Sequence, residues 1–495
     1  MNLKNILDGI EGLKAKGELD LEIEGIESNS KKIEKGFLFV AIKGFTVDGH
    51  EFIGSAIENG AVAVVVDELC DLKALKIPSN VTLIVAKDTR EFLALASANF
   101  YGNPSEKFKL IGITGTKGKT TTTFMIKEIL EKAGKKVGLI GTIATYINGR
   151  KIADSDRTTP ESLELQRTFA DMVKEGVEYV VMEVSSQSLK LHRVDGCHFD
   201  YVAFTNFSED HISEKEHPNM EDYLQSKLKL FHMCKTGFVN IDDLQGNKIP
   251  AMFPDSDITG YGIDNFGNFL AKDITITNSY VDFKAKIADR NERVKVDIPG
   301  RFTVYNALCA ICVCRKIGVE SSVMKEALEK IKVPGRSEMV ENKLEIPIMI
   351  DYAHSPESLQ NILQAVKSYT RGRVISVFGC GGDRDTTKRP IMGEISGKIA
   401  DFTIITSDNP RTEDPQTIVD EIETGIKKTK GKYVCIVDRI EAIKYAINMA
   451  SKKDIIVLAG KGHEPYQEIN GVKHPFDERI IVNDIISKIN KKGKN

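Results

Sequence analysis

The sequence predicts an α/β protein of three domains, with a central parallel sheet of the phosphate-loop type, helices on both faces of that sheet, and a Rossmann-like C-terminal domain. Apolar strand-like segments alternate with amphipathic helical segments, which is typical of parallel sheets covered by helices. A loop rich in glycine and threonine follows one apolar segment. The chain has 495 residues, which is too long for one ordinary core.

Composition limits the class of function. Hydrophobic residues make up 41% and charged residues 28%, as in ordinary globular proteins. The formal net charge of -3 gives no reason to expect general nucleic-acid binding. The N-terminal segment lacks the apolar region of a signal peptide, and no apolar run approaches the ~18 residues that span a bilayer. We therefore expect a cytoplasmic protein with neither a nucleic-acid nor a membrane partner. We also predict a monomer, which composition does not decide.

The first predicted domain covers residues 1–104. Residues 36–42 (GFLFVAI) and 61–66 (AVAVVV) are predicted as short buried strands. Residues 51–60 (EFIGSAIENG) are predicted as a helix that ends at a glycine. The turn-rich segment at residues 103–108 (NPSEKF) then marks a domain boundary.

The central domain is predicted over residues 105–333. Residues 109–134 contain an apolar strand, a Gly/Thr loop and an amphipathic helix, and residues 136–141 (KVGLIG) complete a βαβ unit. Further strands are expected at residues 178–184 and 201–206.

The C-terminal domain is predicted over residues 334–495. Four apolar segments separated by helical stretches predict a doubly wound sheet. These segments are IPIMIDYA (346–353), RVISVFG (373–379), FTIITSD (402–408) and DIIVLAG (454–460).

The loop GTKGKTT, residues 115–121, is the strongest signal for a ligand. Its glycines allow backbone N–H groups to approach an anion, and the following helix offers its positive end to phosphate. Lys119 is placed to reach the β- and γ-phosphates, and Thr120 is placed to bind Mg²⁺. The strict pattern fails because Ile113 stands where its first glycine belongs. The alternative is a glycine-rich turn that caps a helix without a ligand. The residues expected to contact ATP are Gly115, Thr116, Lys117, Gly118, Lys119, Thr120 and Thr121.

Glu183 ends a predicted buried strand in the same domain. The carboxyl ends of parallel strands line the ligand crevice, so this carboxylate is placed to bind Mg²⁺. The alternative is a helix-capping or ion-paired surface glutamate.

Three cysteines, Cys309, Cys312 and Cys314, lie in an apolar helical run. They are predicted to pack as small hydrophobic residues, rather than to bind a metal.

Eight segments together resemble the Mur ligases, in the family's order and over essentially the whole chain. The segments are GTKGKTT, MEVSSQSLKLHRV, TNFSEDH, YLQSKLKLF, DYAHSPESL, GGDRDTTKRP, SDNPRTEDP and GKGHE. The resemblance implies an ATP- and Mg²⁺-dependent ligase of peptidoglycan precursor synthesis. ATP would phosphorylate the terminal carboxylate of UDP-N-acetylmuramoyl-L-alanyl-D-glutamate, and the amine of meso-diaminopimelate would attack the acyl phosphate. The three domains would hold the UDP-sugar, ATP and the amino acid, in that order.

The resemblance also implies substrate-binding residues. For Thr158 and Thr159 the alternative to a substrate contact is a place at the N-cap of a helix. For Phe45 the alternative is a surface or core position without a ligand. The positions matching contacts with the UDP-linked substrate are Ser30, Phe45, Thr46, Val47, Thr158, Thr159, Ser185 and Arg193.

The implied catalytic residues are Lys119, Glu183, His211 and Lys227. His211 matches a magnesium ligand, and Lys227 matches a lysine that relatives carbamylate to N6-carboxylysine. The alternative for Lys227 is an exposed position on an amphipathic helix that also carries Lys229. The segment ISEKEHP after His211 departs from the family's commoner form, so His217 is assigned no role. The implied metal ligands are Thr120, Glu183, His211 and, if carbamylated, Lys227.

In the C-terminal domain the resemblance places Arg336 and His354 near ATP. The DNPR segment favours meso-diaminopimelate, because Arg411 can bind a second carboxylate that lysine lacks. The alternative for Arg411 is a surface salt bridge with Glu413 or Asp414. The residues expected at the amino acid are Arg384, Asp408, Asn409, Pro410, Arg411, Gly460 and Glu464.

Other functions stay open at this point. The same ligase could use L-lysine, L-ornithine or another diamino acid. A folylpolyglutamate synthetase-like ligase shares the loop and the acyl-phosphate chemistry. A switch or motor ATPase would need a strand ending in Asp, whereas the strand here ends in Glu183 followed by SSQS. A non-catalytic nucleotide-binding protein would not need Lys119, His211 and Lys227.

Overall fold

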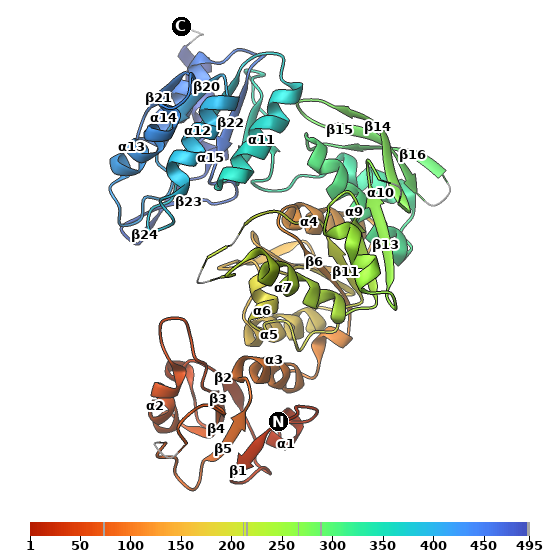
Figure 1. The fold of residues 1–495 in the computed structure, drawn as a ribbon, viewed down its shortest axis with the longest axis vertical. Helices are drawn as coiled ribbons and strands as arrows, with labels where there is room; N and C mark the ends of the chain where they lie inside the picture. Colours follow the sequence, from red (N-terminus) through yellow and green to blue (C-terminus); the bar gives the residue numbers. More distant parts are fainter. Residues whose placement is uncertain (73–74, 211, 214–215, 266, 288–289, 493–495) are drawn as a thin grey trace. The chain divides into compact units, whose positions relative to one another are not determined.

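A computed structural model describes residues 1–72, 75–210, 212–213, 216–265, 267–287 and 290–492 (Figure 1). Its contacts divide the chain into two compact units, residues 1–270 with 308–324 and residues 271–307 with 325–495. Both units contain parallel strands and helices, which confirms the predicted α/β class. The predicted domain limits stay a prediction. No helix in the described part of the chain is long and apolar enough to cross a membrane.

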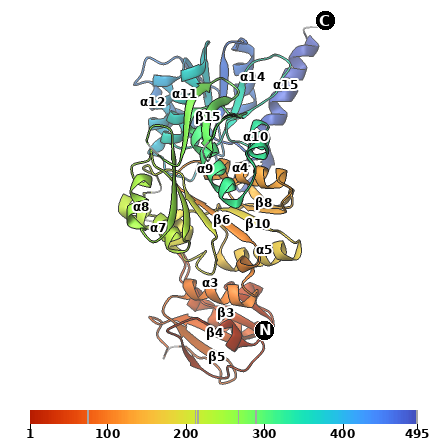
Figure 2. The ribbon, with the colours of Figure 1, turned by 90° about the vertical axis from the view of Figure 1, so that its right-hand side faces the viewer.

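The N-terminal sheet has the strand order β1-β5-β4-β3-β2. The two predicted buried strands are present as β3 and β4, which pair in parallel. The predicted helix at residues 51–60 is a 3-10 turn, Gly49–Phe52, followed by a shorter α-helix, α2. Within the same unit, α3 packs near α5 of the central sheet (Figures 1 and 2). The elements are α1 (Leu3–Ile6), β1 (Lys14–Lys16), β2 (Gly25–Glu27), β3 (Phe37–Val40), α2 (Ile53–Glu58), β4 (Ala61–Asp67), β5 (Thr82–Ala86) and α3 (Thr89–Phe100).

The central sheet has the order β13-β12-β11-β6-β10-β7-β8-β9, in which β6, β7 and β10 to β13 are parallel. β10 lies between β6 and β7, so the predicted βαβ unit crosses over a strand that comes later in the chain. The strands are β6 (Lys109–Thr114), β7 (Val137–Ile140), β8 (Ala144–Ile147), β9 (Arg150–Asp154), β10 (Tyr179–Glu183), β11 (Tyr201–Phe204), β12 (Thr236–Asn240) and β13 (Asp257–Gly262). An antiparallel extension consists of β14 (Phe269–Ile276), β15 (Val281–Ile287) and β16 (Arg290–Val296).

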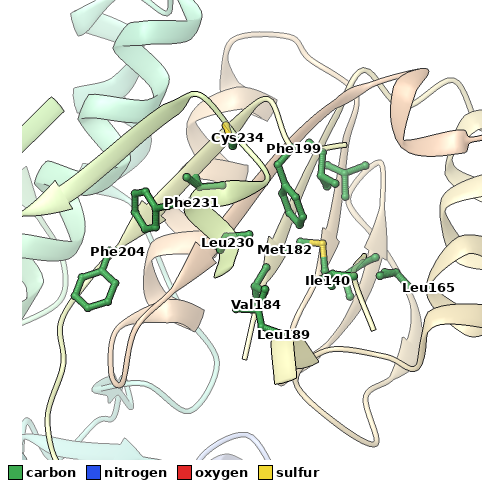
Figure 3. Close-up of a cluster of buried hydrophobic side chains, with 14 of the residues drawn as sticks. Ile140, Leu165, Met182, Val184, Leu189, Phe199, Phe204, Leu230, Phe231 and Cys234 are labelled. Carbon is green, nitrogen blue, oxygen red and sulfur yellow. The ribbon is translucent and has the colours of Figure 1, made fainter. Parts of the chain in front are cut away.

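Helices cover both faces of the central sheet. Figure 3 shows part of the apolar cluster that α5, α6 and α7 form against one face. Val180 and Met182 of β10 belong to this cluster. Because side chains alternate along a strand, Val181 faces the other side, where α4 contacts β6, β7 and β10. The helices are α4 (Lys119–Lys132), α5 (Ser162–Lys174), α6 (Ser186–Lys190), α7 (Met220–His232), α8 (Ile249–Met252), α9 (Arg301–Ile317) and α10 (Ser321–Glu329).

The predicted packing role of the three cysteines on α9 is confirmed. Cys309, Cys312 and Cys314 are all buried. Burial raises the pKa of the Cys309 thiol to about 12, so it stays protonated and is a poor metal ligand.

The C-terminal sheet has the order β17-β18-β22-β19-β20-β21, with all neighbours after β18 parallel. Helices α11 to α13 pack on one face, and α14 and α15 on the other. Figure 2 shows α11 and α12 on the opposite side from α14 and α15, as the Rossmann-like prediction requires. The helices are α11 (Pro356–Tyr369), α12 (Lys388–Ile399), α13 (Pro415–Ile426), α14 (Arg439–Met449) and α15 (Glu478–Lys492). The strands are β17 (Glu338–Met339), β18 (Ile348–Asp351), β19 (Val374–Phe378), β20 (Phe402–Ile405), β21 (Tyr433–Cys435), β22 (Ile455–Ala459), and the hairpin β23 (Tyr466–Ile469) with β24 (Val472–Pro475).

Candidate active site

The phosphate loop joins β6 directly to α4. Gly115 has φ +140°, and a Cβ there would lie 2.0 Å from Oγ1 of Thr205, so only glycine fits. The Nζ atom of Lys119 donates to the carbonyl oxygens of Gly115 (2.9 Å) and Thr116 (3.0 Å). The loop therefore presents the positive end of α4 with a lysine folded back over it, which suits a phosphate group.

The end of β11 supports the loop from the neighbouring strand. The backbone N–H of Lys117 donates to Oδ1 of Asn206 (2.8 Å), and Oγ1 of Thr205 donates to the Lys117 carbonyl (2.6 Å). The N–H of Thr116 donates to the Asn206 carbonyl (2.9 Å). Thr205 and Asn206 were not among the predicted site residues, although both lie in the TNFSEDH segment at a strand end.

Glu183 lies at the end of β10 and is only 1% exposed. Its carboxylate accepts hydrogen bonds from Oγ1 of Thr120 (3.0 Å) and from the N–H of Thr142 (2.8 Å), and Thr142 also contacts Oγ1 of Thr158 (3.1 Å). The surface alternative for Glu183 is therefore wrong. Thr142 was missed because no motif marks it. His211 lies outside the described residues.

The oxygens of Thr120 and Glu183 suit Mg²⁺, which prefers hard oxygen ligands. In the described ranges, no group of three or more His, Cys, Asp or Glu side chains forms a ready metal cage. This arrangement fits an ion that takes most of its remaining ligands from phosphate and water.

Lys227 is buried on α7, with 1% of its surface exposed, whereas Lys229 on the same helix is exposed. Its Nζ atom donates to the Gly115 carbonyl (2.9 Å) and lies 4.4 Å from the ring centroid of Tyr223. Burial, followed by the nearby charge of Lys119, holds the pKa of Lys227 well below its usual value. The alternative of an exposed lysine at this position is wrong.

The predicted contacts to the peptide part of the substrate gather next to Glu183. Oγ1 of Thr159 donates to the Glu183 carbonyl (2.9 Å) and accepts from the N–H of Ser185 (3.1 Å). Arg193 donates to the Thr159 carbonyl (3.2 Å) and pairs with Glu161 (3.0 Å). Glu161 is the N-cap residue of α5, so the N-cap alternative for the two threonines before it is wrong.

The predicted uridine contacts lie in the N-terminal sheet region. Ser30 is buried at the start of a 3-10 helix, Ser30–Lys32. Phe45 is 67% exposed and Val47 52% exposed, in a turn closed by the N–H of Gly44 and the Val47 carbonyl (2.9 Å). Thr46 lies in the same exposed turn. Phe45 is thus a surface aromatic residue and not a core one.

The predicted amino-acid residues converge after β20 and β22. Nδ2 of Asn409 donates to Glu464 (2.8 Å), and the buried Lys461 donates to Oδ1 of Asn409 (2.9 Å). Gly460 has φ +114°, and a Cβ there would lie 2.5 Å from Oδ2 of Asp408. The structure therefore brings Asp408, Asn409, Gly460 and Glu464 together. Lys461 was not predicted, although it lies in the GKGHE segment between Gly460 and Glu464.

Arg411 has φ +53° and pairs through Nε with Glu468 of β23 (3.1 Å). Its Nη1 atom also donates to the Gly382 carbonyl (2.6 Å). Arg411 therefore forms a salt bridge, as its alternative proposed, but with a different partner: Glu413 pairs with Arg389 (2.9 Å), and Asp414 caps α13. Glu468 was missed because its position in the sequence carries no local signal.

The remaining predicted residues of this domain lie on loops between strands and helices. Arg384 is exposed on the loop after β19, and the N–H of Gly382 on that loop donates to the Asn409 carbonyl (2.9 Å), next to Pro410. Arg336 and His354 both contact Tyr352, with the guanidinium 4.7 Å and the imidazole 4.5 Å from its ring centroid.

We expect replacement of Glu464 by glutamine to raise the unfolding temperature by about 1–3 °C at neutral pH. Burial raises the pKa of Glu464, so folding disfavours its charged form. The charged form of Glu464 therefore lowers the free energy of unfolding. This loss is absent below the ordinary carboxyl pKa and grows as pH rises from there through the raised pKa of the folded state.

Calorimetry at about pH 4 and at neutral pH tests this. The difference between the two proteins should disappear at the lower pH. A Glu441→Gln variant, at a side chain that is 58% exposed, is the control. An equal shift at both pH values would contradict the prediction.

Three domain families match the chain in order. The matches are Mur ligase family, catalytic domain (residues 22–101), Mur ligase middle domain (residues 113–314) and Mur ligase, glutamate ligase domain (residues 335–462). UDP-N-acetylmuramoyl-L-alanyl-D-glutamate–2,6-diaminopimelate ligase of Caldanaerobacter subterraneus subsp. tengcongensis is 48% identical, over 99% of this chain and 100% of that protein. The chain belongs to the Mur ligase family.

As a Mur ligase, the protein is an ATP-dependent enzyme that uses Mg²⁺ and forms an amide bond. The enzyme of the same name from Clostridium botulinum is 46% identical, over 99% of this chain and 100% of that protein. A solved structure of a ligase of this name matches with a TM-score of 0.72 and 29% identity, over 99% of each chain. The three-domain Mur ligase fold is therefore shared over the whole length.

Proposed function

We propose that this Mur ligase adds meso-diaminopimelate to UDP-N-acetylmuramoyl-L-alanyl-D-glutamate, in the cytoplasm, during peptidoglycan precursor synthesis. The full-length relatives carry both substrates in their names. The observation that carries the proposal is the cluster of Asp408, Asn409 and Glu464, with Arg411 two residues further along the same loop and paired with Glu468. The acidic groups suit the ammonium groups of a diamino acid, and Arg411 suits the second carboxylate of diaminopimelate.

The reaction must activate a carboxylate, which is a poor electrophile. The terminal phosphoryl group of ATP passes to the D-glutamate carboxylate, giving an acyl phosphate and ADP. The amine of diaminopimelate then attacks the carbonyl carbon. The C–N bond forms as the C–O bond breaks, phosphate leaves with the electron pair, and the amine loses a proton.

The phosphate loop and Lys119 would stabilise the negative charge of the transferred phosphoryl group. Thr120, Glu183 and His211 would hold Mg²⁺, which offsets the charge of the crowded phosphates when bound. Arg336 and His354 would also contact ATP.

We also propose that Lys227 is carbamylated. Its neutral amine would attack the carbon of CO₂, so that an N–C bond forms as one C=O π bond opens onto oxygen. Loss of a proton from nitrogen then leaves a carbamate anion in place of the neutral amine. Burial next to Lys119 and the Gly115 carbonyl supports this, because it disfavours the ammonium form that cannot react. The new carboxylate would join the Mg²⁺ ligands.

The UDP-linked substrate would lie along residues from two regions of the first compact unit. Its peptide would contact Thr158, Thr159, Ser185 and Arg193. Among the described residues, the buried Nε atom of Arg193 has no hydrogen-bond partner, which supports a carboxylate ligand there. The nucleotide end would contact Ser30 and the exposed turn at residues 45–47.

Phosphate release from ATP and Mg²⁺ with the UDP-linked dipeptide tests the function, with diaminopimelate, L-lysine and L-ornithine compared. Turnover with diaminopimelate alone is expected. Turnover with lysine or ornithine, but not with diaminopimelate, would contradict the proposed amino acid and would support the proposed ligase reaction. Turnover with none of them would reject the proposed acceptor and donor pair.

Replacing Arg411 by leucine is expected to lower kcat/KM for diaminopimelate about 10²-fold, because a second carboxylate would lose its charged partner. The value for lysine should change little. Thr412→Val is the matched control, since Thr412 lies on the same loop and bonds to Asp383 (2.7 Å). Equal losses in both variants would mean that the loop, and not the charge of Arg411, determines the effect.

A further inference from the structure

His217 forms hydrogen bonds with two helices, α6 and α7. It is 0% exposed. Its Nδ1 atom lies 2.6 Å from Oδ2 of Asp222 on α7, and its Nε2 atom lies 2.9 Å from Oγ of Ser186 on α6. The Asp222 carboxylate can only accept, so Nδ1 donates its N–H to it, and Nε2 is then the acceptor for the serine hydroxyl. His217 belongs to the ISEKEHP segment, which departs from the family's commoner form, and its imidazole is buried and hydrogen-bonded on both sides.

The Ser186, His217 and Asp222 arrangement has the connectivity of a hydrolase triad. However, Ser186 is only 5% exposed and His217 is fully covered, so a substrate has no access to the hydroxyl. Asp222 also accepts from Lys190 of α6 (2.8 Å), and Lys190 donates to the Glu216 carbonyl (3.0 Å). These bonds cross-link α6, α7 and the segment between them.

The imidazole also contacts the residues around Lys227. The rings of His217 and Tyr223 have centroids 5.0 Å apart. Tyr223 is 1% exposed, and its hydroxyl lies 3.1 Å from Oγ1 of Thr116 in the phosphate loop. The Nζ atom of Lys227 lies 4.4 Å from the centroid of the same tyrosine ring. A continuous set of contacts thus runs from His217 to the loop and to Lys227.

The other side of His217 leads to the peptide-binding candidates. Ser186 follows Ser185, which is the N-cap residue of α6 and accepts from the N–H of Ser188 (3.1 Å). The N–H of Ser185 donates to Oγ1 of Thr159, and the same hydroxyl donates to the Glu183 carbonyl. Movement of the start of α6 would therefore displace Ser185 as well.

We propose that His217 is a positioning residue for the ligase reaction. It holds Tyr223 and Lys227 against the phosphate loop. It also fixes the start of α6, next to the residues proposed to bind the peptide that ends in the D-glutamate carboxylate. Because it is fully buried, it would contact none of the three substrates. The inference rests on the proposed function only for the choice of substrates.

The test measures kcat and each KM for His217→Ala, Tyr223→Phe and the double variant, with the amino acid that the wild-type enzyme turns over. We expect His217→Ala to lower kcat about 10- to 100-fold. The KM for the amino acid should stay within about twofold, since its candidate residues are not in contact with this network. Because Tyr223→Phe removes the hydroxyl contact with Thr116, the two effects should be less than additive.

Ser226→Ala is the matched control, because Ser226 is buried on α7 and bonds within the helix to the Asp222 carbonyl (2.7 Å). Ser186→Ala removes the hydrogen-bond partner of Nε2 and leaves the imidazole in place. We expect it to lower kcat as His217→Ala does, so the proposal can still be tested where His217→Ala does not fold. A folded His217→Ala or a Ser186→Ala enzyme with the kcat of Ser226→Ala would overturn the proposal. Wild-type turnover with an amino acid other than diaminopimelate would reject only the proposed substrate.

Discussion

Replacing Glu183 by glutamine is expected to lower kcat about 10²- to 10³-fold. The carboxylate is almost fully buried and accepts from Thr120 and Thr142. Glutamine keeps the shape but removes the charge, and its amide nitrogen can face a donor that then loses its acceptor. The variant should also need more Mg²⁺ for half-maximal activity, because one anionic ligand is missing.

Phosphate release measured across a Mg²⁺ titration checks this prediction. Glu178→Gln is the control, because Glu178 directly precedes the same strand and pairs at its exposed end with Lys135 (3.1 Å). Wild-type activity and wild-type Mg²⁺ dependence in Glu183→Gln would remove Glu183 from the proposed site.

Replacing Lys227 by methionine is expected to lower kcat about 10²- to 10³-fold, whereas Lys229→Met should stay near the wild-type value. The two lysines lie on the same helix, but only Lys227 is buried and bonded to the Gly115 carbonyl. Methionine fills the buried volume, so the fold should be retained while the nitrogen is lost.

A carbamate at Lys227 has its own measurement. Enzyme equilibrated with ¹³C-labelled bicarbonate should show a carbamate carbon resonance that is present in Lys229→Met and absent in Lys227→Met. Activity should fall when CO₂ is removed and return when it is restored. Full activity without CO₂ and without the resonance would mean that Lys227 acts as an amine.

Much of the fold is predictable because it depends on local patterns. The apolar segments that became β3, β6, β10, β19 and β22 are short, bounded by polar or glycine-rich turns, and separated by helical stretches. The order of strands is not local. β10 separates β6 from β7, although it comes later in the chain, since each crossover helix can skip a strand in a doubly wound sheet.

The candidate site divides in the same way. The phosphate loop, Glu183 and the DNPR segment have recognisable residue patterns next to predicted strands. Thr142 and Glu468 lack such patterns, because each acts through a partner that is distant in the sequence. A contact between distant residues leaves no trace in the composition or periodicity near either of them.

The sequence by itself determined the fold class, the phosphate loop and the family resemblance, because apolar periodicity and ordered motifs are encoded by neighbouring residues. Only the tertiary structure decided that Lys227 is buried while Lys229 is exposed, that Arg411 pairs with Glu468, and that His217 joins α6 to α7. Burial and ion pairing depend on which distant segments pack together. The same lysine or histidine can therefore be a solvated side chain or a buried part of the site, depending on the packing around it.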